Sequence, residues 1–214
     1  MSSEERRPRR GFMLAVSSPS GAGKTSLCRR LTSDHEHLIL SISVTTRGPR
    51  PGEEHGREYH FITDAEFDRL LEQDALLEWA EVHGARYGSP RLPIEQALAD
   101  GEDILFDIDW QGAGKIAARA PLDTVRVFVM PPSMSELSRR LYARAQDNPD
   151  VIERRLRNAK GEIAQWGQYD YIIVNDDFDR SYAEFAHIYH AERSRRQRNL
   201  WLSGYVDGLM NEPV

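Results

Sequence analysis

The chain has 214 residues, of which 40% are hydrophobic and 29% charged, and its formal net charge is −6. This balance is typical of a globular protein with one well-buried core, and it argues against a general nucleic-acid-binding protein, whose surface would be basic. No apolar run is long enough to span a bilayer, and residues 2–10 lack the apolar core of a secretory signal, so we expect no membrane partner. Cys28 is the single cysteine, so an internal disulfide cannot form, which agrees with a cytoplasmic location. We predict that Cys28 is a small buried side chain.

The first elements of the chain form a strand, a loop and a helix. Residues 1–10 are basic and polar, and we predict a disordered tail. The apolar segment Phe12–Ser17 predicts a buried parallel strand, and 26–31 predicts a helix. Between them residues 18–25 read S-P-S-G-A-G-K-T. Backbone N–H groups of such a loop, together with the helix N-terminus, can surround one phosphate group.

Two side chains at the end of this loop carry the chemistry expected of it. Lys24 would reach the β- and γ-phosphates of a nucleotide, and the Thr25 hydroxyl would hold Mg²⁺. Only three of the 28 basic residues are lysines: Lys24, Lys115 and Lys160. Because lysine is rare in this chain, its presence in the loop supports a phosphate-binding role. The usual pattern, G-x-x-x-x-G-K-[ST], has glycine where this chain has Ser18. Backbone N–H groups bind the phosphate, and serine has the same backbone N–H as glycine. The replacement would matter only if this position required a positive φ.

Strand-like and helix-like segments alternate along the rest of the chain, which indicates an α/β fold with a parallel sheet. Thr63 and Glu66 form a capping-box pattern at the start of a helix over Asp64–Leu71. Ser133 is expected to cap a helix that runs to about Ala143. The predicted core strands are Phe12–Ser17, Leu38–Ser43, Asp103–Asp109, Val125–Met130 and Tyr171–Asn175.

One long stretch, residues 45–93, interrupts the alternation and predicts an inserted subdomain, because it is too long for a loop. It contains strand-like segments at Glu58–Ile62 and Leu76–Val82. Near its start, Arg47 and Arg50 flank a proline, and two arginines on a stiffened loop can hold one phosphate through several N–H donors.

Glu78 lies in an otherwise apolar part of the same stretch. Strand alternation puts it on one face with Leu76 and Ala80, so we expect a buried carboxylate that needs a partner. Guanine offers one, since its N1–H and N2–H₂ donors lie side by side and match two carboxylate oxygens. Trp79 is predicted to belong to the core. The neighbouring residues predicted to be solvated charges are Arg57 and Arg86.

A turn-rich break at 145–150 lies between two predicted helices and could act as the hinge of a lid. In the second helix, apolar residues recur at the spacing of one helix face. At about 100° per residue Arg155 flanks that face, whereas Arg154 and Arg157 point away. The residues of the apolar face are Ile152, Leu156, Ala159, Ile163 and Trp166.

Six motifs beyond the phosphate loop resemble guanylate kinase, and they occur in the order found in that family. The resemblance covers roughly residues 11–190. It implies a P-loop nucleoside monophosphate kinase fold with a parallel sheet core, a GMP-binding subdomain at 44–93 and a mobile lid at about 144–156. Residues 191–214 would form a C-terminal helix and tail. The six motifs are 43–53, 56–61, 77–80, 86–89, 107–112 and 173–177.

The resemblance implies transfer of the ATP γ-phosphoryl group to GMP with Mg²⁺, and it assigns a role to each matching residue. The residues implied to bind ATP are Ser18, Pro19, Ser20, Gly21, Ala22, Gly23, Lys24, Thr25 and Asn175. Those implied to bind the GMP phosphate are Ser43, Arg47, Arg50, Tyr59 and Tyr87. Those implied to recognise guanine are Glu78, Ser89 and Asp109. Mg²⁺ would be held by Thr25 and, through water, by Asp107, and the catalytic cations would be Lys24, Arg144 and Arg155.

Three points stay open at this stage. The usual Gly-Arg-Gly around the first lid arginine is Ala143-Arg144-Ala145 here, which bears on lid closure. Asp107 could serve a structural hydrogen bond instead of Mg²⁺. Two other functions remain: a scaffold domain that binds phosphopeptides with this fold, or a kinase for another nucleoside monophosphate. The oligomeric state, and a preference for GMP over dGMP, do not follow from the sequence.

Overall fold

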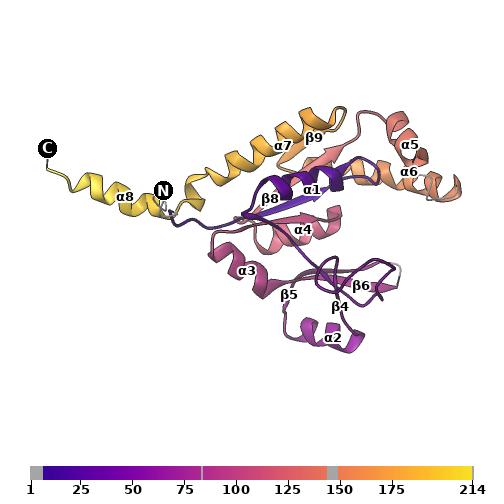
Figure 1. Cartoon of the computed structure of the whole chain (residues 1–214), viewed down its shortest axis with the longest axis horizontal. Coiled ribbons are helices and arrows are strands. Elements are labelled where there is room, and N and C mark those ends of the chain that lie inside the picture. Colours follow the sequence, from indigo (N-terminus) through magenta and orange to yellow (C-terminus); the bar gives the residue numbers. More distant parts are fainter. Residues whose placement is uncertain (1–6, 83, 144–148, 214) are drawn as a thin grey trace.

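A five-stranded parallel sheet forms the centre of the computed structural model, which describes residues 7–82, 84–143 and 149–213 (Figure 1). The fold is therefore the expected α/β type, and the five predicted core strands are the strands of this sheet. In spatial order they are β2 (Leu38–Leu40), β7 (Asp103–Asp107), β1 (Met13–Ser17), β8 (Thr124–Met130) and β9 (Tyr171–Val174).

Helices cover both faces of this sheet because its strands are apolar on both sides. On β1, Leu14 and Val16 pack into one core with α1 (Lys24–Asp34) and α7 (Phe178–Arg193). Met13, which points the other way, packs into a second core with α3 (Arg91–Ala99) and α4 (Trp110–Arg119). Cys28 is 2% exposed in the first core, as predicted, and burial raises the pKa of its thiol to about 12, so it is an inert packing residue.

Two of the core strands end two or more residues earlier than predicted. β2 stops at Leu40 because only three of its residues pair with β7, and the chain then turns toward the second sheet. β7 stops at Asp107, and Asp109 instead caps α4: its Oδ1 accepts the Gly112 N–H at 2.8 Å. Both early ends bring polar side chains to the carboxyl edge of the sheet.

A second, four-stranded sheet lies below the central one in the view of Figure 1, and its described strands all fall within 44–93. Its core is small and contains Val44, Phe67 and Leu76. Thr63 and Glu66 form the predicted capping box of the helix beside it. The elements are, in spatial order, β4 (His60–Phe61), β3 (Val44–Thr45), β6 (Ala85–Pro90) and β5 (Leu76–Val82), with helix α2 (Asp64–Glu72).

Two helices pack against each other beyond β8: α5 (Met134–Ala143) and α6 (Pro149–Ile163). Ser133 caps α5 as predicted, since its Oγ accepts the Glu136 N–H at 3.0 Å. Trp166 does not belong to the apolar face of α6, because it lies in the separate 3₁₀ helix η1 (Trp166–Gln168) and is 55% exposed. The predicted hinge at 145–150 lies outside the described residues except for its last two positions. The side chains that join α5 and α6 are Leu137, Leu141, Ile152 and Ala159.

Arg9 and Arg10 of the predicted disordered tail are held against the body of the protein, which corrects that part of the prediction. Asp103 at the start of β7 is fully buried, and a buried carboxylate requires donors. Arg9 supplies two of them, at 2.8 and 3.1 Å, and Arg10 pairs with Asp123. Residues 1–6 of the tail lie outside the described residues.

The arginine-rich segment near the end of the chain is also partly buried. Arg198, in the 3₁₀ helix η2 (Arg196–Arg198), is 2% exposed and donates to Glu192 at 3.1 Å. The last helix, α8 (Trp201–Met210), projects from the body of the protein in Figure 1. None of the helices in the described part of the chain is both long and apolar enough to cross a bilayer.

Candidate functional site

The phosphate loop connects β1 to α1 and contains two glycines in the left-handed region. Gly21 has φ 94° and Gly23 has φ 98°. Among the described residues Asp74 is the only non-glycine residue with a positive φ, so Ser18 does not need the conformation that favours glycine. Serine at the first position of the pattern is therefore compatible with the loop.

Side chains from distant elements hold this loop in shape. The Asn175 side-chain amide donates to the Ala22 carbonyl at 2.7 Å, and a Cβ on Gly23 would lie 2.2 Å from that amide nitrogen. Arg140 donates to the Asn175 carbonyl at 3.0 Å and to the Glu136 carboxylate at 2.7 Å. Asn175 thus contacts the loop backbone, and a direct contact with ATP stays a prediction.

Arg140 and Glu162 were not predicted to contact the loop. Glu162, near the end of α6, accepts a hydrogen bond from the Ser20 backbone N–H, and burial raises the pKa of its carboxyl. It lies seven residues after Arg155, two helical turns on, so the same periodicity that selected Arg155 could have indicated it. Arg140 offered no comparable signal, because its partners come from elements far apart in the sequence.

Three predicted residues meet where the loop enters α1. Val16 and Asp107 are partners in the register of β1 and β7, which brings Asp107 beside the loop. The Thr25 hydroxyl donates to Asp107 Oδ2 at 2.8 Å, and the Lys24 ammonium forms an ion pair with Asp107 Oδ1. Burial lowers the pKa of the Lys24 ammonium from its usual value. The Lys24 ammonium, the Thr25 hydroxyl and the Asp107 carboxylate are therefore adjacent.

A cleft of about 510 Å³ joins this corner to the second sheet. Thr25 and Asp107 line it from the phosphate-loop side, and Ser43 and Tyr59 line it from the other side. Arg57, predicted to be a solvated charge, also lines it while paired with Glu54 and Glu58.

Arg47 lies beside Tyr59 and Tyr87, two other residues of the predicted phosphate clamp, and its role in binding phosphate stays a prediction. Its guanidinium donates to both oxygens of Glu53 at 2.9 Å and has the Tyr87 hydroxyl as a further hydrogen-bond partner. The Tyr59 ring lies 5.5 Å from the guanidinium carbon and 5.7 Å from the Tyr87 ring. The Arg50 N–H donates to Glu53 at 2.8 Å, and this bond, followed by the Arg47 side chain, holds the pKa of Glu53 below its usual value. Sequence reasoning missed Glu53 as the partner of the clamp.

Glu78 is 7% exposed, which confirms the prediction of a buried carboxylate. It pairs with Ser89 in the register of β5 and β6, and the fully buried Ser89 hydroxyl donates to its Oε1 at 2.8 Å. Burial raises the pKa of Glu78, and the nearby Asp109 adds to this effect. A shift in register between Leu76 and Glu78 interrupts simple alternation, so these two and the residue between them are all buried.

Two predictions about neighbouring side chains were wrong. Trp79 is 41% exposed instead of lying in the core, since the shift in register turns it outward between Phe67 and Lys115. Arg86 is not solvated: it is 19% exposed, pairs with Asp64 and Asp68 on α2, and lies over the Phe67 ring.

Of the two predicted lid arginines, the described residues include one. Arg155 is half-buried on α6 while Arg154 and Arg157 are exposed, which confirms the predicted orientation. Arg144 lies outside the described residues, together with residues 145–148 of the predicted lid, whereas the rest of the predicted lid is part of α6.

Comparisons with known proteins agree with one another over almost the whole chain. The family model described as guanylate kinase matches residues 11–192. Guanylate kinase of Caulobacter vibrioides is 58% identical over 207 residues, 97% of both chains, and that of Brucella melitensis is 55% identical over 205 residues, 95% of this chain and 93% of the relative. The crystal structure of guanylate kinase from Anaplasma phagocytophilum has a TM-score of 0.78 and 35% identity, and covers 97% of this chain and 100% of its own.

Proposed function

Because the chain belongs to the guanylate kinase family, we propose that it transfers the γ-phosphoryl group of ATP to GMP, giving ADP and GDP. The observation that carries this proposal is the cleft lined from one side by Thr25 and Asp107 and from the other by Ser43 and Tyr59. A cleft of this kind can hold a phosphoryl donor and a phosphoryl acceptor against each other. The product, GDP, belongs to purine nucleotide metabolism, and we propose a cytoplasmic location.

Transfer from ATP requires no strong general base in this site. The attacking oxygen belongs to the GMP phosphate, which is already ionised at neutral pH. Catalysis then depends on alignment of the two phosphates and on neutralisation of their charge. Lys24 supplies one cation beside the phosphate loop, and Arg155 on α6 supplies another, with Arg144 proposed as a third.

The residues beside the loop fit a magnesium ion. The Thr25 hydroxyl and the Asp107 carboxylate are 2.8 Å apart, and both are the oxygen ligands that Mg²⁺ takes. In the described part of the chain no group of three or more His, Cys, Asp and Glu side chains could hold a metal. Such a small protein ligand set suits Mg²⁺ bound together with nucleotide phosphates. The ion would neutralise charge on the β- and γ-phosphates, with Thr25 as a direct ligand and Asp107 acting through water.

The acceptor phosphate would bind at the Arg47 clamp. Arg47 and Arg50 provide cationic donors, and burial raises the pKa of the Tyr59 hydroxyl, which keeps it a neutral donor. In the present structure Arg47 is bound to Glu53, so the GMP phosphate must share or displace that carboxylate.

The base would be recognised by Glu78, with Ser89 and Asp109 beside it. An ionised Glu78 offers two acceptor oxygens to guanine N1–H and N2–H₂, one of which already accepts from Ser89. Adenine has an acceptor at N1 and no amino group at position 2, so it would leave the Glu78 carboxylate oxygens unpaired. A site built on such hydrogen bonds rejects the mismatched base strongly.

The test is a coupled assay of ADP formation with GMP, dGMP, AMP, CMP and UMP as acceptors. The proposal requires Mg²⁺-dependent ADP formation with GMP, and dGMP is an additional candidate substrate. Preference for another monophosphate would favour a different kinase, and no turnover with any acceptor would favour the scaffold function. The retained Lys24 and Thr25, with Asp107 positioned beside them, argue against a scaffold.

A further inference from the structure

Helix α4 of the main body holds strand β5 of the second sheet through two cations one helical turn apart. The Lys115 ammonium donates to the Trp79 carbonyl, and the Arg119 guanidinium donates to the Leu76 carbonyl at 2.9 Å. Leu77 packs between them into the core that contains Ile116. These contacts fix the part of β5 that carries Glu78.

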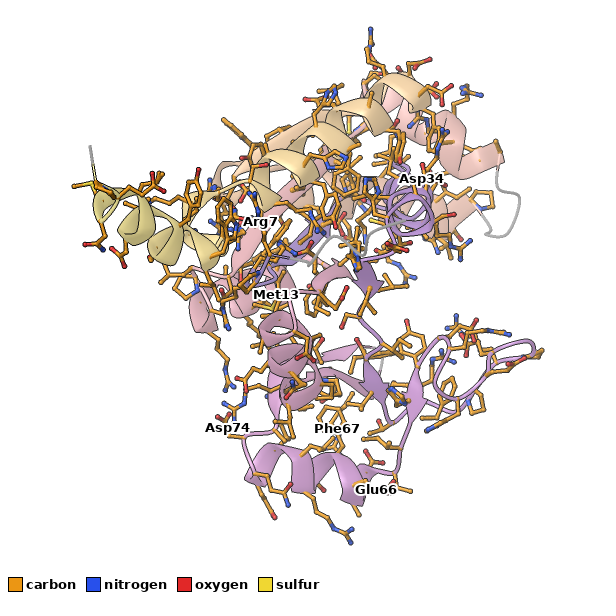
Figure 2. The ribbon with its side chains drawn as sticks, turned by 60° about the vertical axis from the view of Figure 1, so that its left-hand side comes forward. Arg7, Met13, Asp34, Glu66, Phe67 and Asp74 are labelled. Atoms are coloured by element: carbon orange, nitrogen blue, oxygen red, sulfur yellow. The ribbon has the colours of Figure 1, made fainter. Side chains whose placement is uncertain are left out.

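The two cations have different partners. Arg119 donates to Asp74 at 2.8 Å, and Asp74 also accepts from Arg91 at 2.9 Å, so Arg119 is tied into an ion-pair network at the start of β5. Asp74 lies at that end of the second sheet in Figure 2. Lys115 instead contacts the neutral carbonyl of Trp79, and its ammonium lies 5.6 Å from the centroid of the Trp79 ring.

We propose that Lys115 is a positioning residue for guanine recognition, which fixes β5 at Trp79 and keeps positive charge beside the Glu78 carboxylate. This inference rests on the proposed function, since it concerns the base that Glu78 binds. Lys115 does not touch the substrate; it acts through Glu78.

The groups that face Glu78 explain why a cation is needed there. Ser89 on β6 donates to the carboxylate, and Asp109 at the start of α4 contributes a like charge. Burial has the largest effect and raises the pKa of Glu78, Asp109 acts in the same direction, and Ser89 and Lys115 oppose them. Of the described groups that favour the ionised form, the Ser89 hydrogen bond would remain without Lys115. A protonated Glu78 would lose one of the two acceptors that guanine requires.

The experiment compares Lys115→Met, which keeps an unbranched side chain of similar length and removes its charge, with Lys115→Arg, which keeps the charge. Arg196→Met, which removes an exposed cation from η2, is the matched control. Initial rates are measured with GMP and with IMP, which lacks the N2 amino group but has the same phosphate. Far-ultraviolet circular dichroism and thermal unfolding check that each variant is folded.

In Lys115→Met we expect the KM for GMP at pH 7 to rise about fivefold, the change expected from the loss of one solvent-exposed charge near a carboxylate. The kcat and the KM for ATP should change less than about twofold, because the phosphate groups bind elsewhere. Lys115→Arg should restore most of the GMP affinity, and Arg196→Met should match the parent enzyme.

A pH profile separates an effect on Glu78 from a general loss of structure. The ratio of kcat/KM for GMP to that for IMP cancels the titration of the substrate phosphate. In Lys115→Met this ratio should fall at a higher pH than in the parent, because Glu78 is protonated more readily. Lys115→Arg should follow the parent profile.

Two results would overturn the inference. One is an unchanged KM for GMP in Lys115→Met. The other is an equal loss in Lys115→Met and Lys115→Arg with no change in the pH profile, which would make Lys115 a structural contact only. If the parent protein itself fails to phosphorylate GMP, the proposed function fails, and that result is independent of the variants.

Discussion

The phosphate loop and the Arg47 clamp both bind phosphate in the proposed reaction, but they are held in shape by different means. The loop takes contacts from three other elements: Asn175 after β9, Arg140 on α5 and Glu162 on α6. The clamp takes its main ionic contact from Glu53, only six residues from Arg47. We call the phosphate loop, which would bind ATP, the donor half of the site, and the Arg47 clamp, which would bind GMP, the acceptor half. The donor half is thus preorganised by the whole fold, and the acceptor half is organised locally.

The same contrast extends to the sheets that carry them. β1 lies in the middle of the central sheet and all five of its residues are buried. β3 and β4, beside the clamp, are two residues long, and the core beneath them is small. Elements with few buried apolar contacts open more easily than core strands. The acceptor half is therefore the part expected to adjust when GMP binds, with Arg47 then shared between Glu53 and the phosphate.

The largest effect is expected at the donor half, in Lys24→Ala. Loss of the loop cation should lower kcat by about 10³-fold, because it removes charge stabilisation that develops during transfer. GMP binding should be almost unchanged, since the clamp lies on the other side of the cleft. Steady-state kinetics and calorimetric titration with GMP provide the check. A near-normal kcat would contradict the catalytic assignment of Lys24.

The next effect tests recognition of the base in Glu78→Gln. The amide replaces one acceptor oxygen by a donor, so GMP should lose about 10²-fold in kcat/KM while AMP changes little. Competition between GMP and AMP in one assay measures the selectivity directly. A strong preference for GMP that survives this change would exclude Glu78 as the residue that recognises guanine.

A smaller effect is expected in Glu53→Gln, which tests the local organisation of the clamp. Without the carboxylate Arg47 loses its main ionic contact and is no longer held in place, so the KM for GMP should rise about tenfold, near the lower end of the about 1.5–3 kcal/mol that a hydrogen bond to a charged group contributes. The KM for ATP should stay the same, because the loop is held by other elements. A parallel rise in both constants would mean that the two halves are not organised separately.

The smallest effect concerns acid stability through Glu136, which holds Arg140 behind the loop. The Arg139 and Arg140 side chains lower its pKa to about 2 from the ordinary value of 4.5. A lowered pKa means that this group stabilises the fold above about pH 4.5 and loses that contribution as the pH falls toward 2. Glu136→Gln should therefore unfold at lower urea concentration than the parent at pH 7, and the difference should shrink below pH 4. A difference that is constant with pH would argue against this ion pair.

Structural features formed by residues close together in the sequence were predicted well. The strand, loop and helix around Lys24 follow from apolar periodicity and from glycines at two positions where positive φ is used. The capping box of α2 is confirmed, and so is the burial of Glu78, because an acid within an apolar run needs a partner wherever it folds.

Contacts between distant segments could not be predicted in this way. The outward position of Trp79 depends on a shift in register between β5 and β6, and strand alternation alone does not reveal it. Arg9 belongs to a tail whose polar composition predicts exposure to solvent. It nevertheless binds Asp103, ninety-four residues away, because burial of that carboxylate requires donors.

By itself the sequence predicted the chemistry proposed for this protein: a phosphate loop, arginines for a phosphate, a carboxylate for guanine and, through the family resemblance, arginines for a lid. These are properties of residue type and short spacing, which survive in any packing that buries the apolar faces. Only the tertiary structure decided which groups hold that chemistry in place, among them Asn175 behind the loop, Glu53 beside Arg47 and Lys115 beside Glu78. Such partners are selected by distance in space, which depends on the order and register of the strands.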